Sequence, residues 1–193
     1  MTAVPVQQRM TADEFLAITE GEGPRGQELV SGEVIVHEPS ALHNYVIESL
    51  MFALSAWTRS AGGGGRVFVP LDVKLDELNV FAPDLSWYST GHVPRAHDPP
   101  PYPCPDLVIE ARSPSTWRYD VGAKKAAYER HGLTELWLAD TKAEEVLVFR
   151  RSRPSSEGFD VALELGVGEE LGSPLLPGFR LALDELFDLT SGR

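Results

Sequence analysis

Two short, largely apolar runs, each with an acidic residue at one end, constrain this chain more than any other feature. Asp84 immediately precedes the run at residues 85–88, and Glu110 immediately follows the run at residues 107–109. Apolar runs of this length are typical of strands buried in a sheet. A carboxylate at the edge of an apolar core needs a partner, because an unpaired buried charge is costly. The sequence therefore predicts two buried strands that each hold one carboxylate.

These two acids, together with a lysine farther along the chain, have the chemistry of a metal site. Carboxylate oxygens are the ligands that Mg²⁺ and Mn²⁺ prefer, and a divalent cation can assist phosphodiester cleavage. Lys124 lies in a helix predicted to begin at Asp120 and to run through His131. Other interpretations remain open: Asp84 could be a strand-start residue bonded to nearby backbone, Asp120 a helix cap, and Lys124 a solvated helix residue. If Lys124 faces the two acids, we expect its removal to impair the chemistry and to leave folding unchanged.

The rest of the pattern predicts a sheet flanked by helices. A capping box at Thr11 and Glu14 begins a short helix, and apolar residues at helical spacing mark a long amphipathic helix over residues 43–57. Further helices are predicted at 120–131 and 183–187, and strands at 28–30, 33–36, 66–69, 73–75, 85–88, 107–110, 135–140, 145–149 and 159–163. Because no linker or repeat interrupts this order, we expect a single domain of the α/β (α+β) class over residues 1–193.

One connection between the predicted strands, residues 89–105, is a long loop. It contains His92, His97 and a proline-rich run at 99–105, and proline cannot donate the hydrogen bonds of a central strand. Loops of this length are often functional, so we expect this one to lie at the mouth of the site. Because the chain has a single cysteine, a zinc site at the two histidines is not expected.

The composition bears on location and partners. No apolar stretch approaches the roughly 18 residues that a membrane helix needs, residues 1–9 lack the apolar run of a secretory signal, and Cys104 has no partner for an internal disulfide. We therefore expect a cytoplasmic protein without a membrane partner. The net charge of −12 opposes broad DNA binding, although a metal site concentrates acids and a bound divalent ion supplies positive charge for a phosphate.

Several motifs occur in an order that resembles a known family. They are residues 28–33, 83–84, 106–110, 113–116, 135–140 and 171–179, together with His43, Asp120, Lys124, Tyr128 and Gly132. This ordered set, which spans nearly the whole chain, resembles the Uma family of restriction endonucleases, once catalogued only as a domain of unknown function. The resemblance implies a restriction-endonuclease-like, PD-(D/E)xK fold: a mixed β-sheet flanked by helices. The activity that it implies is divalent-metal-dependent phosphodiester cleavage.

The resemblance also implies metal ligands, carried over residue by residue. Asp84 and Glu110 match the family's metal-binding acids, which would hold Mg²⁺ or Mn²⁺. The main-chain carbonyl of Ala111 could complete the inner shell. Glu28 is the candidate third acid, because members of the superfamily often recruit one from the N-terminal part of the chain. In this scheme the cation activates a water and neutralises charge on the phosphate.

The catalytic cation departs from the superfamily pattern. Arg112 stands two residues after Glu110, where the superfamily has a lysine, and arginine stays protonated and cannot act as a general base. Arg112 could hold a phosphate oxygen instead. The Uma-type pattern places a lysine on the following helix, which Lys124 matches, and its ammonium could orient the attacking water or stabilise the pentacovalent state.

The resemblance favours DNA as the substrate and a homodimer as the assembly. Seven cations are expected near the predicted site and its loops: Arg59, Arg66, Arg95, Arg112, Arg118, Lys124 and Lys125. They could form a local basic surface, and a two-fold dimer would place two such surfaces beside the two strands of a duplex. Two other functions remain open: a nuclease-like interaction or regulatory module, and a metal-dependent hydrolase of a smaller phosphoester.

Overall fold

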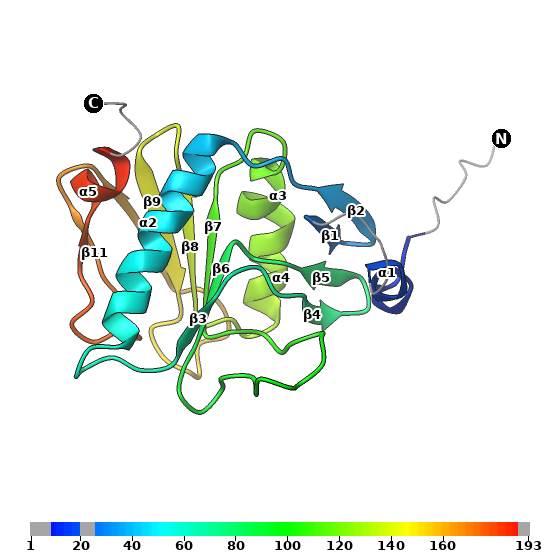
Figure 1. The fold of residues 1–193 in the computed structure, drawn as a ribbon. Helices are drawn as coiled ribbons and strands as arrows, with labels where there is room; N and C mark the ends of the chain where they lie inside the picture. The colour runs from blue at the N-terminus through cyan, green and yellow to red at the C-terminus, as the bar shows by residue number, and fades with distance from the viewer. Residues whose placement is uncertain (1–8, 20–25, 189–193) are drawn as a thin grey trace.

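The computed structural model describes residues 9–19 and 26–188, so the N-terminal residues 1–8 that entered the prediction about a signal lie outside it. Two sheets form its framework (Figure 1). The larger has the order β10 (Val161–Gly166), β9 (Glu145–Arg150), β8 (Glu135–Asp140), β7 (Leu107–Ala111), β6 (Leu85–Tyr88) and β3 (Arg66–Phe68). The smaller has the order β2 (Glu33–Val36), β1 (Gln27–Val30), β5 (Asn79–Phe81) and β4 (Val73–Asp76).

The larger sheet is mixed, because β7 and β8 pair in parallel while its other neighbours pair antiparallel. Parallel strands need a crossover, and here it consists of α3 (Trp117–Tyr119), a π-helical turn η1 (Asp120–Lys124) and α4 (Lys125–Arg130). The other helices are α1 (Ala12–Thr19), α2 (Ala41–Thr58) and α5 (Leu183–Asp188), and a short pair of strands, β11 (Glu170–Leu171) and β12 (Leu181–Ala182), precedes α5. The predicted mixed sheet flanked by helices is confirmed.

The two faces of the larger sheet pack against different layers. One face, with Ile109 of β7 and Trp137 of β8, meets α2 and α5 in the main apolar core. The opposite face, with Val108 of β7 and Leu138 of β8, meets α4 and part of the smaller sheet. Because side chains alternate along a strand, Glu110 points to the second face, between the two sheets.

Local sequence signals account for the first elements. Backbone and side-chain hydrogen bonds between Thr11 and Glu14 form the predicted capping box. Ser31 and Gly32 both have positive φ, 52° and 81°, as the tight turn between β1 and β2 requires. The side chain of Ser40 caps α2 at the amide of His43, so the helix begins at Ala41 rather than at residue 43.

The predicted helix over 120–131 is wrong at its start. The helical segment begins at Trp117, and Asp120 lies in the wider π-helical turn, with its side chain buried, instead of capping an end. Turns of this kind are frequent at functional sites. The Ser113 hydroxyl accepts from the amide of Thr116 and so satisfies a backbone donor at the true start, which explains the earlier boundary.

The loop at 89–105 does not lie where the sequence suggested. It joins the end of β6 to the start of β7, whereas Asp84 precedes β6 and Glu110 is near the end of β7. The loop therefore lies at the opposite end of these strands from the two acids. Its proline-rich part is anchored there by the hydroxyl of Tyr88, which donates to the carbonyl of Pro103 at 2.7 Å.

The prediction missed the shortest strands. Strand β5 was not predicted, because its three residues are too few to show a period, and neither were the two-residue strands β11 and β12. The edge strand expected at 159–163 lies at 161–166. Among the helices that the structure describes, none is both long and apolar enough to cross a membrane.

Candidate active site

The two predicted acids lie side by side where β6 begins and β7 ends. Leu85 pairs with Ile109 in the antiparallel ladder, which places Asp84 across from Glu110. Two hydrogen bonds join the strand ends: the amide of Asp84 donates to Glu110 Oε2 at 3.3 Å, and the amide of Ala111, the residue after Glu110, donates to Asp84 Oδ2 at 2.8 Å. The strand register therefore brings both carboxylates to one point of the sheet.

Lys124 reaches this point from the π-helical turn. Its Nζ atom lies 2.8 Å from Glu110 Oε1, 2.9 Å from Glu28 Oε2 and 3.1 Å from Asp120 Oδ1. The Lys124 side chain is only 1 % exposed, so the interpretation of Lys124 as a solvated residue is wrong. One ammonium group thus holds three buried carboxylates, which we call the Lys124 cluster: Lys124, Glu28, Glu110 and Asp120.

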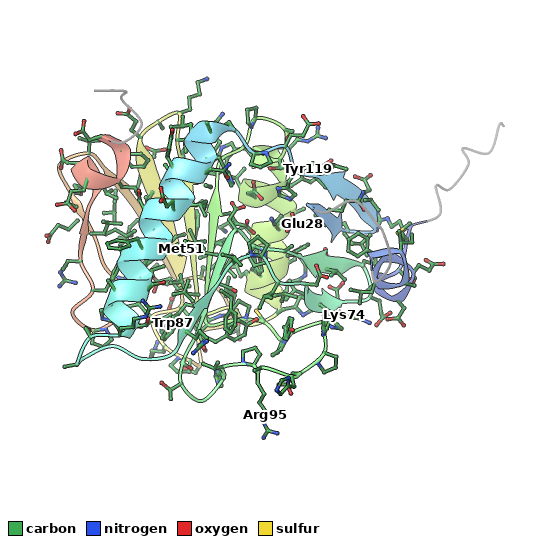
Figure 2. All side chains as sticks on the ribbon, viewed as in Figure 1. Glu28, Met51, Lys74, Trp87, Arg95 and Tyr119 are labelled. Carbon is green, nitrogen blue, oxygen red and sulfur yellow. The ribbon has the colours of Figure 1, made fainter. Side chains whose placement is uncertain are left out.

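Glu28 is held from three sides. Besides Lys124, its Oε2 atom contacts His37, and its Oε1 atom accepts from the amide of Ala82 at 2.7 Å. Figure 2 shows Glu28 on the smaller sheet, beside the helices that carry the lysine. Both Glu28 oxygens are therefore engaged within the protein, and its contacts anchor Lys124. A role as third metal ligand stays a prediction.

The cluster holds more negative than positive charge, and the pKa values reflect this. Burial raises the pKa of Glu110 to about 8, with Glu28, Asp120 and Asp84 adding to the effect against the attraction of Lys124. Burial would raise the pKa of Glu28 too, but Lys124 and His37 lower it to about 2. Burial also raises the pKa of Asp120. Burial therefore holds the pKa of Glu110 above its ordinary value, whereas Lys124 and His37 hold the pKa of Glu28 below its ordinary value.

Two further side chains touch the acids, and sequence reasoning gave neither of them a role. Nε2 of His43 lies 2.9 Å from Asp84 Oδ2, and the hydroxyl of Tyr128 donates to Glu110 Oε1 at 3.2 Å. Burial lowers the pKa of His43, but the hydrogen bond and charge of Asp84 outweigh it, so the pKa is raised. His43 and Tyr128 were visible within the ordered motifs, yet only the fold shows which acid each one meets.

Arg112 contacts other residues than those of the Lys124 cluster. Its Nη1 atom lies 2.6 Å from Asp140 Oδ2, and its guanidinium lies 5.3 Å from the ring centre of Trp117. The structure gives Arg112 no contact with the described members of the Lys124 cluster. Its predicted role on the phosphate stays a prediction, and would require the arginine to leave Asp140.

The other predicted cations do not gather at the site. Arg59 follows the far end of α2 and Arg66 pairs with Tyr88 at the far end of β6, while Figure 2 shows Arg95 projecting from the long loop away from Glu28. Arg118 lies over the ring of Tyr119 and Lys125 over that of Phe149. The single basic surface expected from the sequence is therefore not formed, because these cations lie at opposite ends of the strands.

The arrangement partly fits a hard divalent cation. In the described part of the chain, no group of three or more His, Cys, Asp and Glu side chains is arranged to hold a metal. Asp84 is 16 % exposed, and its Oδ1 atom forms no hydrogen bond with the described residues. From the residues that the structure describes, Glu110 Oε2 accepts the long bond from Asp84 and no other. Asp84 Oδ1 and Glu110 Oε2 are therefore available as ligands. This number suits Mg²⁺, which usually takes one or two carboxylates and keeps several waters.

Comparisons with known proteins identify the fold and the family. A crystal structure from Anabaena variabilis, described as a "putative nuclease belonging to DUF820", is 19% identical and has a TM-score of 0.75, covering 93% of this chain and 98% of that one. At this identity the similarity shows the fold. No curated protein matches the sequence. The family model Uma2, described as "Putative restriction endonuclease", matches residues 12–184. The chain therefore belongs to the Uma2 family of restriction-endonuclease-like proteins, as its ordered motifs suggested.

Proposed function

We propose that this protein is an endonuclease of the PD-(D/E)xK type that hydrolyses DNA phosphodiester bonds with Mg²⁺ or Mn²⁺. The observation that carries the proposal is the pairing of Asp84 with Glu110 at the junction of β6 and β7, with Lys124 2.8 Å from Glu110. Family membership supports a nuclease. The substrate and the cation are the further steps that we propose.

Asp84 and Glu110 would hold the cation, with the main-chain carbonyl of Ala111 as a further donor. When bound, a divalent ion supplies a Lewis acid that neutralises charge on the phosphate and makes a water more acidic. Residues around the two acids hold the carboxylates in position for the ion. His43 and the amide of Ala111 fix Asp84 Oδ2, so Oδ1 remains for a ligand.

Lys124 acts on the reaction through Glu110. Because its ammonium contacts Glu110 Oε1, it fixes that carboxyl group and favours its ionised form. The buried position of Lys124 keeps it from the solvent in which a phosphate would arrive. In this state Lys124 is therefore a positioning residue. Direct contact with the attacking water would need this cluster to open.

The experiment is an incubation of supercoiled, linear and single-stranded DNA with the protein and Mn²⁺ at low salt, where weak phosphate contacts are strongest. We expect cleavage by the wild type and none by Asp84→Asn or Glu110→Gln. Glu135→Gln is the matched control, because Glu135 is a buried acid that contacts Trp137 and Ser173 instead of this site. Cleavage that survives in the two site variants would contradict the proposal.

One observation favours the alternative of a nuclease-like interaction module. The cations that were expected to bind DNA lie apart, and Arg112 is paired with Asp140. In that case the protein would neither cleave nor show salt-sensitive binding of any of the three DNA forms. A smaller phosphoester as the substrate would instead give Mn²⁺-dependent hydrolysis of a simple phosphodiester, lost in Asp84→Asn, without DNA cleavage.

A further inference from the structure

The outer face of α2 carries an exposed stripe of mixed character, with Tyr45 and Phe52 as its aromatic members. Tyr45, Glu48, Phe52, Ala56 and Arg59 are exposed and recur every three or four residues, which places them on one side of the helix. Phe52, at the middle of this stripe, is 76 % exposed. In Figure 1, α2 lies in front of the larger sheet, and no other drawn element covers its outer side. A single exposed aromatic side chain is ordinary, but one that belongs to a contiguous apolar patch marks an interaction site.

An apolar groove runs beside this stripe. It has a volume of about 1000 Å³ and lies between α2 and the segment that leads into α5. Its apolar lining includes Met51 and Trp57 from α2 and Phe179 and Leu186 from the C-terminal segment, and Figure 2 shows Met51 on α2. Phe52 also borders the groove, yet remains largely in solvent. The surface therefore presents an aromatic side chain and, next to it, an apolar hollow.

The charged residues of this surface are placed so that two copies of it could pair acidic with basic side chains. Glu48 lies one turn before Phe52, and Arg59 lies about two turns after it, and both border the groove. If two copies of α2 pack antiparallel about a two-fold axis, the register that places Glu48 opposite the partner's Arg59 also places Phe52 opposite the partner's Ser55. Ser55 and its neighbour Ala56 are small, which leaves room for the ring. The same register thus pairs opposite charges and fits a large side chain against small ones.

We propose that a second copy of this chain occupies this surface, through an antiparallel α2–α2 contact in which Phe52 enters the partner's groove. Such a two-fold contact is isologous, so each charge pair and each aromatic insertion occurs twice. Aromatic side chains seated in apolar pockets commonly dominate the energy of an interface. This contact would be the interface of the dimer that is expected for the proposed nuclease. The proposal depends on the proposed function only through that expectation of a dimer.

Nucleic acid is a poorer occupant. Two carboxylates, Glu48 and Glu185, border the groove alongside Arg59 and Arg180, so the surface offers no net positive charge to a phosphate backbone. Alternating acidic and basic side chains pair well with a protein surface that has the opposite charge at each facing position. A second copy packed antiparallel presents opposite charges in this way.

Sedimentation equilibrium over a concentration series, without DNA or metal, tests the proposal separately from the nuclease activity. We expect a wild-type dimer, and a dissociation constant at least about tenfold higher for Phe52→Glu, because a charge would then enter the apolar groove. Val167→Glu is the control, since Val167 is 51% exposed and lies outside this surface. It should dimerise as the wild type does. Circular dichroism would verify that each variant is folded.

A charge exchange tests the register itself. Glu48→Arg alone and Arg59→Glu alone should each weaken the dimer, because each places like charges opposite one another. The double variant Glu48→Arg, Arg59→Glu should recover wild-type association, because the opposite charges face one another again. A monomeric wild type, an unaffected Phe52→Glu, or a double variant as weak as the single ones would each overturn the proposal.

Discussion

The two faces of strand β7 carry opposite kinds of interaction. Ile109 points into the apolar core under α2, where its neighbours are hydrophobic. Glu110, the next residue, points into the Lys124 cluster on the other face. Both side chains are buried to a similar degree. Ile109 and Glu110 therefore differ in the chemistry of their side chains and not in their burial.

The two faces differ in what they contribute to the free energy of unfolding. Burying an aliphatic side chain such as Ile109 contributes about 1.5–3 kcal/mol. A buried ion pair often contributes little net free energy, because removing the charges from water offsets their attraction. A cluster with three acids around one ammonium is a still poorer source of stability. Its retention beside Asp84 is consistent with the proposed catalytic role.

Removal of the ammonium should have the largest effect on the free energy of unfolding. Lys124→Met leaves Glu28, Glu110 and Asp120 without their cation, and losing one partner of a buried charge pair costs about 3–5 kcal/mol. Urea denaturation measures the loss. Adding Glu28→Gln should restore part of it, because one uncompensated carboxylate disappears. A Lys124→Met variant as stable as the wild type would show that the cluster is not charged as described.

Truncation on the apolar face should cost nearly as much but leave the site intact. Ile109→Ala removes buried methyl groups and leaves a cavity, with an expected loss of roughly 2–5 kcal/mol. Stabilisation by Mn²⁺ should persist in this variant and disappear in Glu110→Gln, one residue away. Thermal denaturation with and without Mn²⁺ compares the two. If Ile109→Ala also lost the response, the two faces would not be independent.

The pH dependence of stability should come mainly from the charged face. Because the pKa of Glu110 is raised from 4.5 to about 8, its stabilising contribution is complete below pH 4.5 and is lost as the pH rises through about 8. The raised pKa values of His37 and His43 act in the same direction. Glu28, whose pKa is lowered to about 2, loses its contribution only as the pH falls below 4.5.

Without metal, the free energy of unfolding should therefore fall by a few kcal/mol between about pH 5 and pH 8.5. Urea midpoints across this range measure the slope, and Glu110→Gln should reduce it. An unchanged slope in Glu110→Gln would assign the pH dependence to the other groups with raised pKa values, among them Asp120, His37 and His43.

Addition of the cation should have a smaller effect. Binding to the native state alone stabilises the protein by roughly 2.7 kcal/mol at a hundredfold excess over the dissociation constant. Mn²⁺ or Mg²⁺ should thus raise the melting temperature of the wild type, and Asp84→Asn should remove the rise. An equal rise in Asp84→Asn would mean that the ion binds elsewhere.

Loss of Arg112 should have the smallest effect on stability. The Arg112–Asp140 pair is partly exposed, and such pairs contribute about 0–1 kcal/mol. Arg112→Ala should therefore melt close to the wild type and keep its response to Mn²⁺, in contrast with Lys124→Met. A loss of several kcal/mol would place Arg112 among the structurally essential cations instead.

The sequence predicted the meeting of Asp84 and Glu110 because both flank short strand-like runs, and the order of motifs identified the family. It also placed Lys124 on the correct segment. Its burial could not be predicted, because Lys124 stands beside a second lysine in a segment that has the pattern of a solvated helix face. The partners of Lys124 are Asp120 in the π-helical turn, Glu110 on β7, and Glu28, which is 96 residues away.

The long loop was misplaced although the order along the chain indicates its position. It follows the run at 85–88, which Asp84 precedes, and it precedes the run at 107–109, which Glu110 follows. The pairing of Asp84 with His43 could not be predicted, because it depends on where α2 crosses the sheet. A contact between distant segments determines that pairing.

A crystal structure of the protein soaked in Mn²⁺, with the anomalous signal of the metal recorded, tests the central claim most directly. We predict a peak roughly 2.1 Å from carboxylate oxygens of both Asp84 and Glu110, with Lys124 still in contact with Glu28. No peak at these two acids, or a peak only at other residues, would contradict a metal-dependent active site at the junction of β6 and β7.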